Sequence, residues 1–146
     1  MAIDRSTIRV KAMLITPHAH LPAHAVALHP PSLENPLGYH RLIGGTVELG
    51  ESHRATIVRE VHEELGATIH ELTYLAAVEN IFELDGVLGH EIVFVYSGRL
   101  DPAPADEGAT LTESDGSRLP IVWRSVSDPN EPLPLYPPGV EPWLGH

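Results

Sequence analysis

Residues 45–67 read GTVELGESHRATIVREVHEELGA, and this stretch decides how the rest of the chain is interpreted. From Ser52 to Leu65 it contains neither glycine nor proline, so it predicts one helix with Ser52 as N-cap and Gly66 as C-terminal stop. At about 100° per residue, three carboxylates share one face of this helix: Glu60, Glu63 and Glu64. The neighbouring face is an apolar stripe that can bury against a sheet, formed by Ile57, Val58, Val61 and Leu65.

The three carboxylates at positions i, i+3 and i+4 repel one another, and each such pair costs a few tenths of a kcal/mol on a solvated helix. The cluster is either an ordinary solvated acidic face or a site for a hard cation. Oxygen-only ligand sets suit Mg²⁺ or Mn²⁺, which often bridge protein carboxylates and substrate phosphates. The upstream Gly44-Gly45 turn and the nearby Arg59 and Glu51 favour the cation site.

The spacing of the fixed residues resembles a known family pattern. Gly45, five residues, Glu51, seven residues and then REVHEELGA from Arg59 resemble the Nudix box, Gly-x5-Glu-x7-Arg-Glu-U-x-Glu-Glu-x-Gly-U, where U is a bulky aliphatic residue. Background composition would give this match by chance on the order of once in a million. Ala67 departs from the pattern, which prefers Ile, Leu or Val there. We expect this position to pack inward, so the departure concerns local packing more than catalysis.

The resemblance implies a fold and an activity. It implies an α/β/α sandwich with a mixed sheet, the box helix packed on one face, and a closing C-terminal helix that the proline-rich tail makes short or irregular. It also implies a divalent-metal-dependent pyrophosphohydrolase that cleaves a nucleoside diphosphate linked to another moiety, with Mg²⁺ or Mn²⁺ as cofactor. The alternative is a non-catalytic Nudix-fold module that senses a nucleotide or mediates an interaction.

The resemblance also assigns roles to residues of the box. The metal ligands it implies are Glu60, Glu63, Glu64 and the carbonyl group of Gly44. Arg59 and Glu51 would orient these carboxylates, although an ordinary surface ion pair remains the alternative. Gly45 and Gly66 would be structural, because they allow a tight turn and a helix end. Glu48 either reaches the cluster through water or is simply exposed.

Outside the box, four residues are candidates for the site. Several Nudix members supply an extra glutamate as metal ligand or general base, and Glu91, at the start of an apolar strand, is that candidate here; its alternative is a surface strand glutamate. Arg41, Tyr39 and Phe82 are candidates for contact with the substrate. Tyr39 and Phe82, like Tyr96, could stack on a base or belong to the core.

The remaining pattern predicts six strands and two irregular segments. The strands are expected at 8–15, 24–29, 39–43, 72–78, 91–96 and 119–126. Residues 101–118 are polar and predict a mobile loop, and the proline-rich tail 128–146 excludes a long closing helix. The histidine-rich segment with His18, His20 and His24 matches no zinc pattern and predicts an exposed loop.

Composition limits the class of partner. The 146 residues predict a single domain, 1–146, and 42% hydrophobic residues suffice for a core. A net charge of −11 disfavours binding to nucleic acid or to an anionic membrane, and a small anionic substrate then requires divalent cations. Without cysteine or an apparent targeting segment, the cytoplasm is the expected compartment. The apolar tail either packs on its own sheet or covers the partner in a homodimer.

Overall fold

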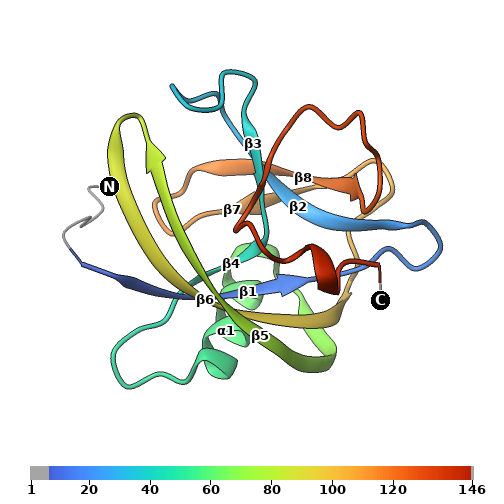
Figure 1. Ribbon diagram of the computed structural model, residues 1–146. Coiled ribbons are helices and arrows are strands. Elements are labelled where there is room, and N and C mark those ends of the chain that lie inside the picture. The colour runs from blue at the N-terminus through green and yellow to red at the C-terminus, as the bar shows by residue number, and fades with distance from the viewer. Residues whose placement is uncertain (1–6, 146) are drawn as a thin grey trace.

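Two mixed β-sheets and an α-helix form the fold in the computed structural model, which describes residues 7–145 (Figure 1). Residues 1–6 and 146, the ends of the predicted domain 1–146, lie outside the described residues. The four-stranded sheet has the order β4 (Ile43–Thr46), β1 (Arg9–Ile15), β6 (Val87–Asp101) and β5 (Thr68–Leu84). The five-stranded sheet has the order β7 (Ala109–Thr112), β8 (Arg118–Ser125), β2 (Ala23–His29), β3 (Tyr39–Arg41) and β9 (Leu135–Tyr136).

The predicted α/β/α sandwich with a mixed sheet and the box helix on one face is confirmed, and the structure has two mixed sheets. Helix α1 (His53–Leu65) packs mainly on β4 and β1, and β1 runs parallel to β6 but antiparallel to β4. The closing element is a single 3₁₀ turn, η1 (Glu141–Trp143), as expected for a short or irregular end. Among the described residues, no helix is long and apolar enough to cross a membrane.

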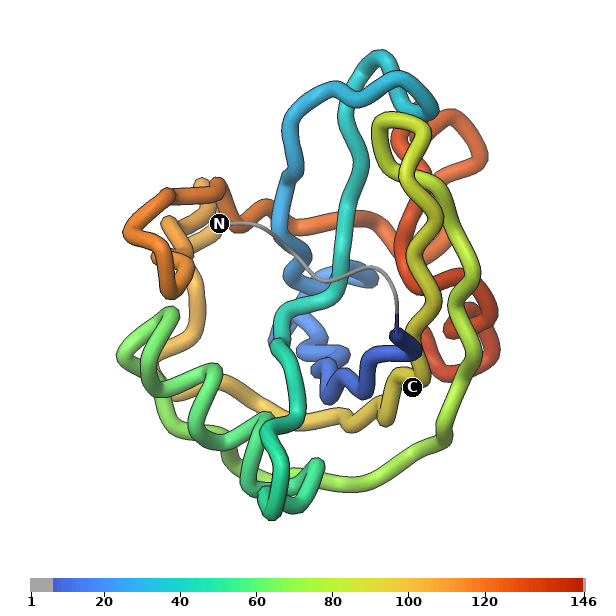
Figure 2. Tube along the Cα trace, turned by 90° about the vertical axis from the view of Figure 1, so that its left-hand side faces the viewer, coloured from blue at the N-terminus to red at the C-terminus, as the bar shows by residue number. Residues whose placement is uncertain are grey.

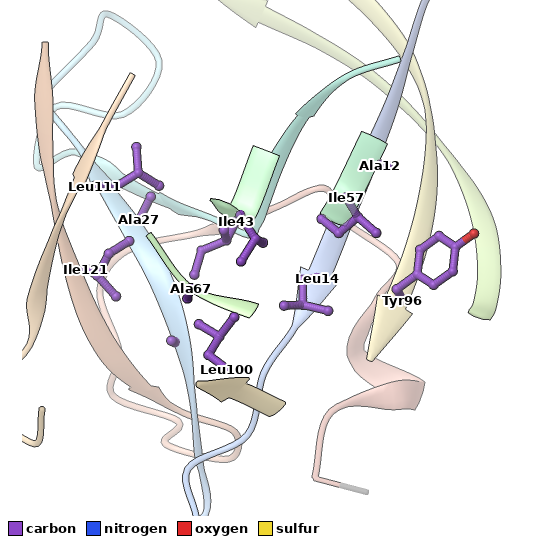
Figure 3. Packing of buried hydrophobic residues seen from close by; sticks show 12 residues of the cluster. Ala12, Leu14, Ala27, Ile43, Ile57, Ala67, Tyr96, Leu100, Leu111 and Ile121 are labelled. Carbon is purple, nitrogen blue, oxygen red and sulfur yellow. The ribbon is translucent and has the colours of Figure 1, made fainter. Parts of the chain in front are cut away.

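Strand β1 is buried on both faces, which explains why its second half is continuously apolar. Alternate side chains point to opposite sides of a strand. Ala12 and Leu14 therefore enter the cluster that lies between the sheets and α1, together with Ile57 of the helix (Figure 3). Met13 and Ile15 enter a second cluster on the other face of the four-stranded sheet.

Helix α1 begins and ends where the sequence predicts. The Ser52 side chain accepts a hydrogen bond from the backbone N–H of Ala55, and Gly66 adopts a left-handed conformation that closes the last turn. Ile57 and Val61 are buried as expected, and so is Ala67 behind the helix. The prediction is wrong for Val58, which is 49% exposed, while Thr56 is fully buried in its place. The buried stripe is thus turned slightly around the helix axis.

Strands β5 and β6 extend well beyond the predicted segments 72–78 and 91–96. They form one long antiparallel hairpin, whose tip lies beside the loop that connects β2 and β3 (Figure 2). The Glu34 carboxylate of that loop accepts hydrogen bonds from the backbone N–H groups of Asp85 and Gly86 at the hairpin turn. The extra residues combine polar side chains with large apolar ones that are exposed, such as Ile81, Val87 and Leu88, so they do not carry the pattern of a buried strand.

The segment 101–118 is not a continuous loop, contrary to the sequence prediction. Residues Ala109–Thr112 form β7, which pairs with β8, and Leu111 is buried between the sheets. Only four residues of the segment form the strand, with a single large apolar side chain among them, so the local sequence reads as polar. Its pairing with β8 is a tertiary contact that local pattern does not reveal.

The histidine-rich segment is also less exposed than predicted. His24 lies in β2 with 1% of its surface exposed, and neither ring nitrogen has a hydrogen-bond partner within the described residues. The His18 ring is packed against Trp123, and its Nδ1 accepts hydrogen bonds from two backbone N–H groups. His20 is exposed, as expected. Burial lowers the pKa of His24 to about 4, and the charge of Arg124 acts in the same direction.

The buried His24 predicts a loss of stability in mild acid. The unfolded chain binds a proton at this residue below its ordinary pKa of 6.5, whereas the folded protein does so only near pH 4. We expect wild type to lose about 2 kcal/mol of unfolding free energy through this group between pH 7.5 and 5, and His24→Leu to abolish that component. Urea unfolding at both pH values measures it, with His62→Leu, an exposed site, as control. Equal pH dependence in wild type and His24→Leu would contradict the assignment.

Candidate active site

Two glycines allow β4 to lie close to its neighbours, with Gly45 facing α1 and Gly44 facing β1. A Cβ atom on Gly45 would lie 2.3 Å from Cδ of Glu60, and one on Gly44 would lie 2.1 Å from the carbonyl oxygen of Ala12 on β1. Both distances are far below any van der Waals contact, so a side chain at either position would displace the strand or the glutamate. Gly45 therefore allows the Glu60 carboxylate to lie directly against the backbone of β4, and Gly44 allows β4 to lie against β1.

Arg59 connects the loop before the helix with the acidic face of the helix. Its Nε and Nη2 donate to the two oxygens of Glu51, at 2.7 and 2.9 Å. Its Nη1 donates to Glu60 at 2.9 Å and to Glu63 at 3.2 Å. Glu51 in turn accepts a hydrogen bond from the hydroxyl group of Thr56 at 2.7 Å. The guanidinium thus has one edge fixed by Glu51 and the other directed at two glutamates of the predicted metal site.

The box glutamates differ in pKa, because each has different hydrogen bonds and burial. Hydrogen bonds from Arg59 and Thr56 lower the pKa of Glu51 to about 2. Burial raises the pKa of Glu60 above its usual range, against the opposing effect of Arg59. Burial also raises the pKa of Glu64 to about 8, and the charges of Glu60, Glu113 and Glu63 add to the shift.

Glu64 is the member of the cluster that Arg59 does not reach. Its Oε1 is buried and has no hydrogen-bond partner among the described residues. An uncompensated buried carboxylate oxygen is costly, and a bound cation would relieve that cost. Together with the oxygen-only donor set and the Gly45 contact, this orphaned oxygen fits a hard divalent ion.

The carboxylates are not, however, arranged around a common point. Within residues 7–145, no three His, Asp or Glu side chains form a preassembled metal site. The reason lies in Arg59, whose Nη1 engages an oxygen of both Glu60 and Glu63. The donor set therefore fits the ion chemically, while the side chains are organised around the guanidinium.

Two adjoining cavities lie next to these residues. The acidic pocket, of about 630 Å³, is lined by Gly44, Gly45, Glu48, Arg59, Glu60, Glu63 and Glu64, among others. The aromatic pocket, of about 540 Å³, is lined by His29, Tyr39, Phe82, His90 and Glu91, among others. Both cavities share a wall formed by Arg9, Lys11, His29, Arg41, Glu113 and Leu119. They therefore form one continuous cleft with an acidic end and an aromatic end.

Glu91 does not join the box glutamates. Both of its oxygens accept from Nη2 of Arg41, at 2.8 and 3.0 Å, and Nζ of Lys11 lies 3.9 Å away. Burial acts to raise the pKa of Glu91, but the charges of Arg41 and Lys11 hold it below its usual range. The Glu91 carboxylate lines the aromatic pocket but not the acidic pocket. This position disfavours it as a metal ligand or general base at the acidic end. Its contacts give it the role of a counter-ion that positions Arg41.

The predicted aromatic residues separate into two groups. Tyr39 stacks on His29 with ring centroids 4.8 Å apart, and with Phe82 it lines the aromatic pocket. Tyr96 is buried, and its hydroxyl group is hydrogen-bonded to the ring of His53, so it is a core residue. Of the other candidates, Arg41 lies in the shared wall, Glu51 lies behind Arg59, and Gly66 only ends the helix.

Three residues of the cleft were not identified as site residues from the sequence. Arg9 and Lys11 are two residues apart on β1, so they point to the same face, and this alternation was a usable signal. Glu113 follows β7, and its charge acts on Glu64 across the acidic pocket. No local pattern marks Glu113, because its position depends on the pairing of β7 with β8.

Comparison with known proteins identifies a family and similar structures. The family model of the NUDIX domain matches residues 23–143. A MutT NUDIX hydrolase from Burkholderia pseudomallei is similar in structure, with a TM-score of 0.64 and 23% sequence identity over 88% of this chain and 91% of that chain. A MutT protein from Bacillus halodurans gives a TM-score of 0.60 and 19% identity over 95% of this chain and 81% of that chain. No curated protein matches the sequence.

The raised pKa of Glu64 predicts that the contribution of this residue to stability decreases as the pH rises. Its folded-state pKa of about 8 exceeds the ordinary value of 4.5, so its contribution to stability is present below pH 4.5 and is lost as pH rises to 8. Glu64→Gln stays neutral, and we expect it to be more stable than wild type by about 2 kcal/mol at pH 8.5, after allowance for solvent screening.

Urea unfolding at pH 5.5 and 8.5 with EDTA present measures the difference. The matched control is Glu107→Gln, which neutralises an exposed carboxylate that lines neither pocket. If Glu64→Gln were no more stable than wild type at pH 8.5, Glu64 would be solvated rather than buried and strained by its neighbours.

Proposed function

The chain belongs to the Nudix hydrolase family, and on that premise we propose that it is a divalent-metal-dependent pyrophosphohydrolase. The family hydrolyses nucleoside diphosphates linked to another moiety. The proposal adds the metal requirement and assigns the acidic pocket as the place of reaction. Its substrate would lie along the cleft, with the diphosphate at the acidic end and the remainder towards the aromatic end.

The observation that carries the proposal is the buried oxygen of Glu64, beside Glu60 and Glu63, which has no hydrogen-bond partner within residues 7–145. A fold does not gain stability from three clustered carboxylates of which one is buried without compensation. A solvated acidic face, the ordinary alternative, would leave Glu64 exposed with an unshifted pKa. The cluster is therefore better explained by a cation than by solubility.

The residues that would hold the ion are Glu60, Glu63, Glu64 and the carbonyl group of Gly44. When bound, a Mg²⁺ or Mn²⁺ ion neutralises charge on the diphosphate and makes a bound water more acidic. Glu51 fixes the Arg59 guanidinium, which in turn fixes the orientation of Glu60 and Glu63. Arg59 would also supply positive charge to the acidic pocket, which it lines.

A water molecule that attacks phosphorus must lose a proton, and a carboxylate of the acidic pocket can serve as the proton acceptor. Glu113 lines the pocket from the other sheet, and its carboxylate accepts a hydrogen bond from the hydroxyl group of Ser117 at 3.1 Å. We propose it as the proton acceptor in place of Glu91, which is held by Arg41. The P–O bond to the leaving phosphate then breaks, giving two phosphate-bearing products.

The proposal predicts that Glu63→Gln/Glu64→Gln lacks metal-dependent turnover. Removal of two of three carboxylate ligands should lower kcat/KM by about a hundredfold or more, because the ion would no longer be held. Purified protein with Mg²⁺ or Mn²⁺ is assayed against nucleoside triphosphates, dinucleotides, sugar nucleotides and coenzyme A, with phosphatase-coupled phosphate release.

The matched control is Glu71→Gln/Glu107→Gln, which removes two negative charges outside the cleft and should retain activity. Unchanged Mg²⁺-dependent turnover in Glu63→Gln/Glu64→Gln would contradict the assignment of the acidic pocket as the place of reaction. Nucleotide binding that needs no metal and leaves the nucleotide intact would instead support a sensing module.

A further inference from the structure

We propose that the paired tips of the β2–β3 loop and the β5–β6 hairpin form a docking surface for another protein, which binds through a segment that carries lysine or arginine beside large apolar side chains. This surface, the tip patch, consists of Leu33 and Leu37 of the loop with Val87 and Leu88 of the hairpin. Such docking goes beyond the proposed activity and does not depend on it.

The exposure of these four aliphatic side chains is the first observation. They expose from 47% to 77% of their surface, and none of them belongs to the apolar clusters found within residues 7–145. Exposed apolar side chains are ordinary when they are scattered singly, whereas a group of them marks an interaction site. Here two of them lie on each of two tips, and the tips lie side by side in both views of the chain (Figure 1 and Figure 2).

Hydrogen bonds fix the two tips to each other. The Glu34 carboxylate accepts from the backbone N–H groups of Asp85 and Gly86, at 2.8 and 3.0 Å. The Asp85 carboxylate in turn accepts from the backbone N–H group of Leu33 at 3.1 Å. Within the loop, two backbone N–H groups donate to the carbonyl oxygen of Asn35. Polar groups of the tips are thus bonded internally while the aliphatic side chains face solvent, and a surface that is already ordered loses little conformational entropy on binding.

The charge around the tip patch indicates the chemistry of the partner. Residues 30–38 and 81–88 contain three acidic residues, Glu34, Glu83 and Asp85, and no lysine, arginine or histidine. Desolvation acts to raise the pKa of Glu34, but the hydrogen bonds from Gly86 and Asp85 hold it below its ordinary value, so this carboxylate is charged at neutral pH. An apolar patch with an acidic rim is complementary to apolar side chains that are flanked by basic ones.

The same charges disfavour two other occupants. A second copy of the chain would bring three acidic residues against three, in addition to the net charge of −11 on each molecule. An anionic membrane surface would be repelled for the same reason. A basic segment of another protein is instead attracted at the rim, and it buries the four aliphatic side chains at the centre of the contact.

The tip patch borders the aromatic pocket. Pro30, at the start of the loop, lines that pocket, and so does Leu84, which pairs with Val87 at the end of the hairpin. A partner on the tip patch would therefore lie beside the aromatic end of the cleft, where it can affect access to the cleft. The box glutamates at the acidic end would stay free.

The test measures the binding of short labelled peptides by fluorescence anisotropy at physiological ionic strength. The probe is an amphipathic peptide of leucine and lysine, and in two control peptides glutamate replaces lysine or serine replaces leucine. We expect wild type to bind the probe but neither control peptide. Leu33→Ser/Leu88→Ser should weaken binding of the probe about tenfold or more, because two apolar contacts are lost. The matched control is Leu21→Ser/Leu49→Ser, which removes two exposed leucines outside the tip patch and should bind as wild type does.

A substitution at the rim tests the electrostatic part. Glu83 is exposed, so Glu83→Gln should weaken binding of the probe about threefold and make it less sensitive to salt. Glu107→Gln, which neutralises an exposed carboxylate outside the tips, should leave the affinity unchanged.

A second readout uses wild type alone and locates the contact. Hydrogen exchange, followed by mass spectrometry, is compared with and without the probe. Exchange should slow in residues 30–38 and 81–88, because the docked peptide covers the two tips. This measurement keeps the proposal testable if Leu33→Ser/Leu88→Ser does not fold, although its unfolding free energy should match wild type because both side chains are exposed.

Several results would overturn the proposal. Wild type that does not bind the probe, or that binds it no better than Leu33→Ser/Leu88→Ser does, would show that the tip patch does not receive a basic segment. Protection confined to the acidic pocket would place the peptide on the box glutamates instead. A dimer in light scattering that Leu33→Ser/Leu88→Ser dissociates would make a second copy the occupant. Binding to phosphatidylcholine vesicles that the same variant loses would make it a membrane.

Discussion

The contact between the Glu60 carboxylate and the glycine backbone of β4 is the constraint on which the rest of the site depends. It places a charged group against a strand where no side chain could fit, and it thereby fixes the distance between helix and sheet. Arg59 makes this arrangement tolerable, because its guanidinium donates to Glu60 while Glu51 holds it from the other side. The loop that precedes the helix is therefore part of the electrostatics of the site, and its hydrogen bonds keep Glu51 ionised.

Strand β1 links this local constraint to the fold as a whole. Its second half, Ala12–Ile15, enters both apolar clusters and anchors the sheet that carries α1. Its first half carries Arg9 and Lys11 into the cleft, beside Thr46 of β4. One strand thus secures the core at one end and places cations at the other. The two functions do not conflict, since the side chains change from apolar to charged where the strand leaves the interior.

The box region could be predicted from sequence because its signals are local. Ser52, Gly66 and the helical period depend on neighbours within a few residues, and the structure places both caps as expected. Leu111 and Glu113 could not be predicted, because a four-residue strand in a polar segment is defined by its partner β8. Glu91 illustrates a different limit. The sequence placed it correctly at the start of an apolar run, but its charge partner Arg41 comes from another sheet. Long-range ion pairs of this kind leave no periodic trace.

The cleft combines opposite electrostatic problems in adjoining spaces. At one end, a buried carboxylate oxygen of Glu64 has no hydrogen-bond partner in the part of the chain that the structure describes, which makes its negative charge costly. In the shared wall, the neighbouring cations of β1 and β3 make buried positive charge costly. The two groups do not neutralise each other directly, because Arg59 and Glu91 engage the nearest members on each side. Buried charges of this kind do not stabilise the fold by themselves. A divalent cation at the acidic end would relieve the cost of the buried carboxylate, as the proposed metal requirement implies.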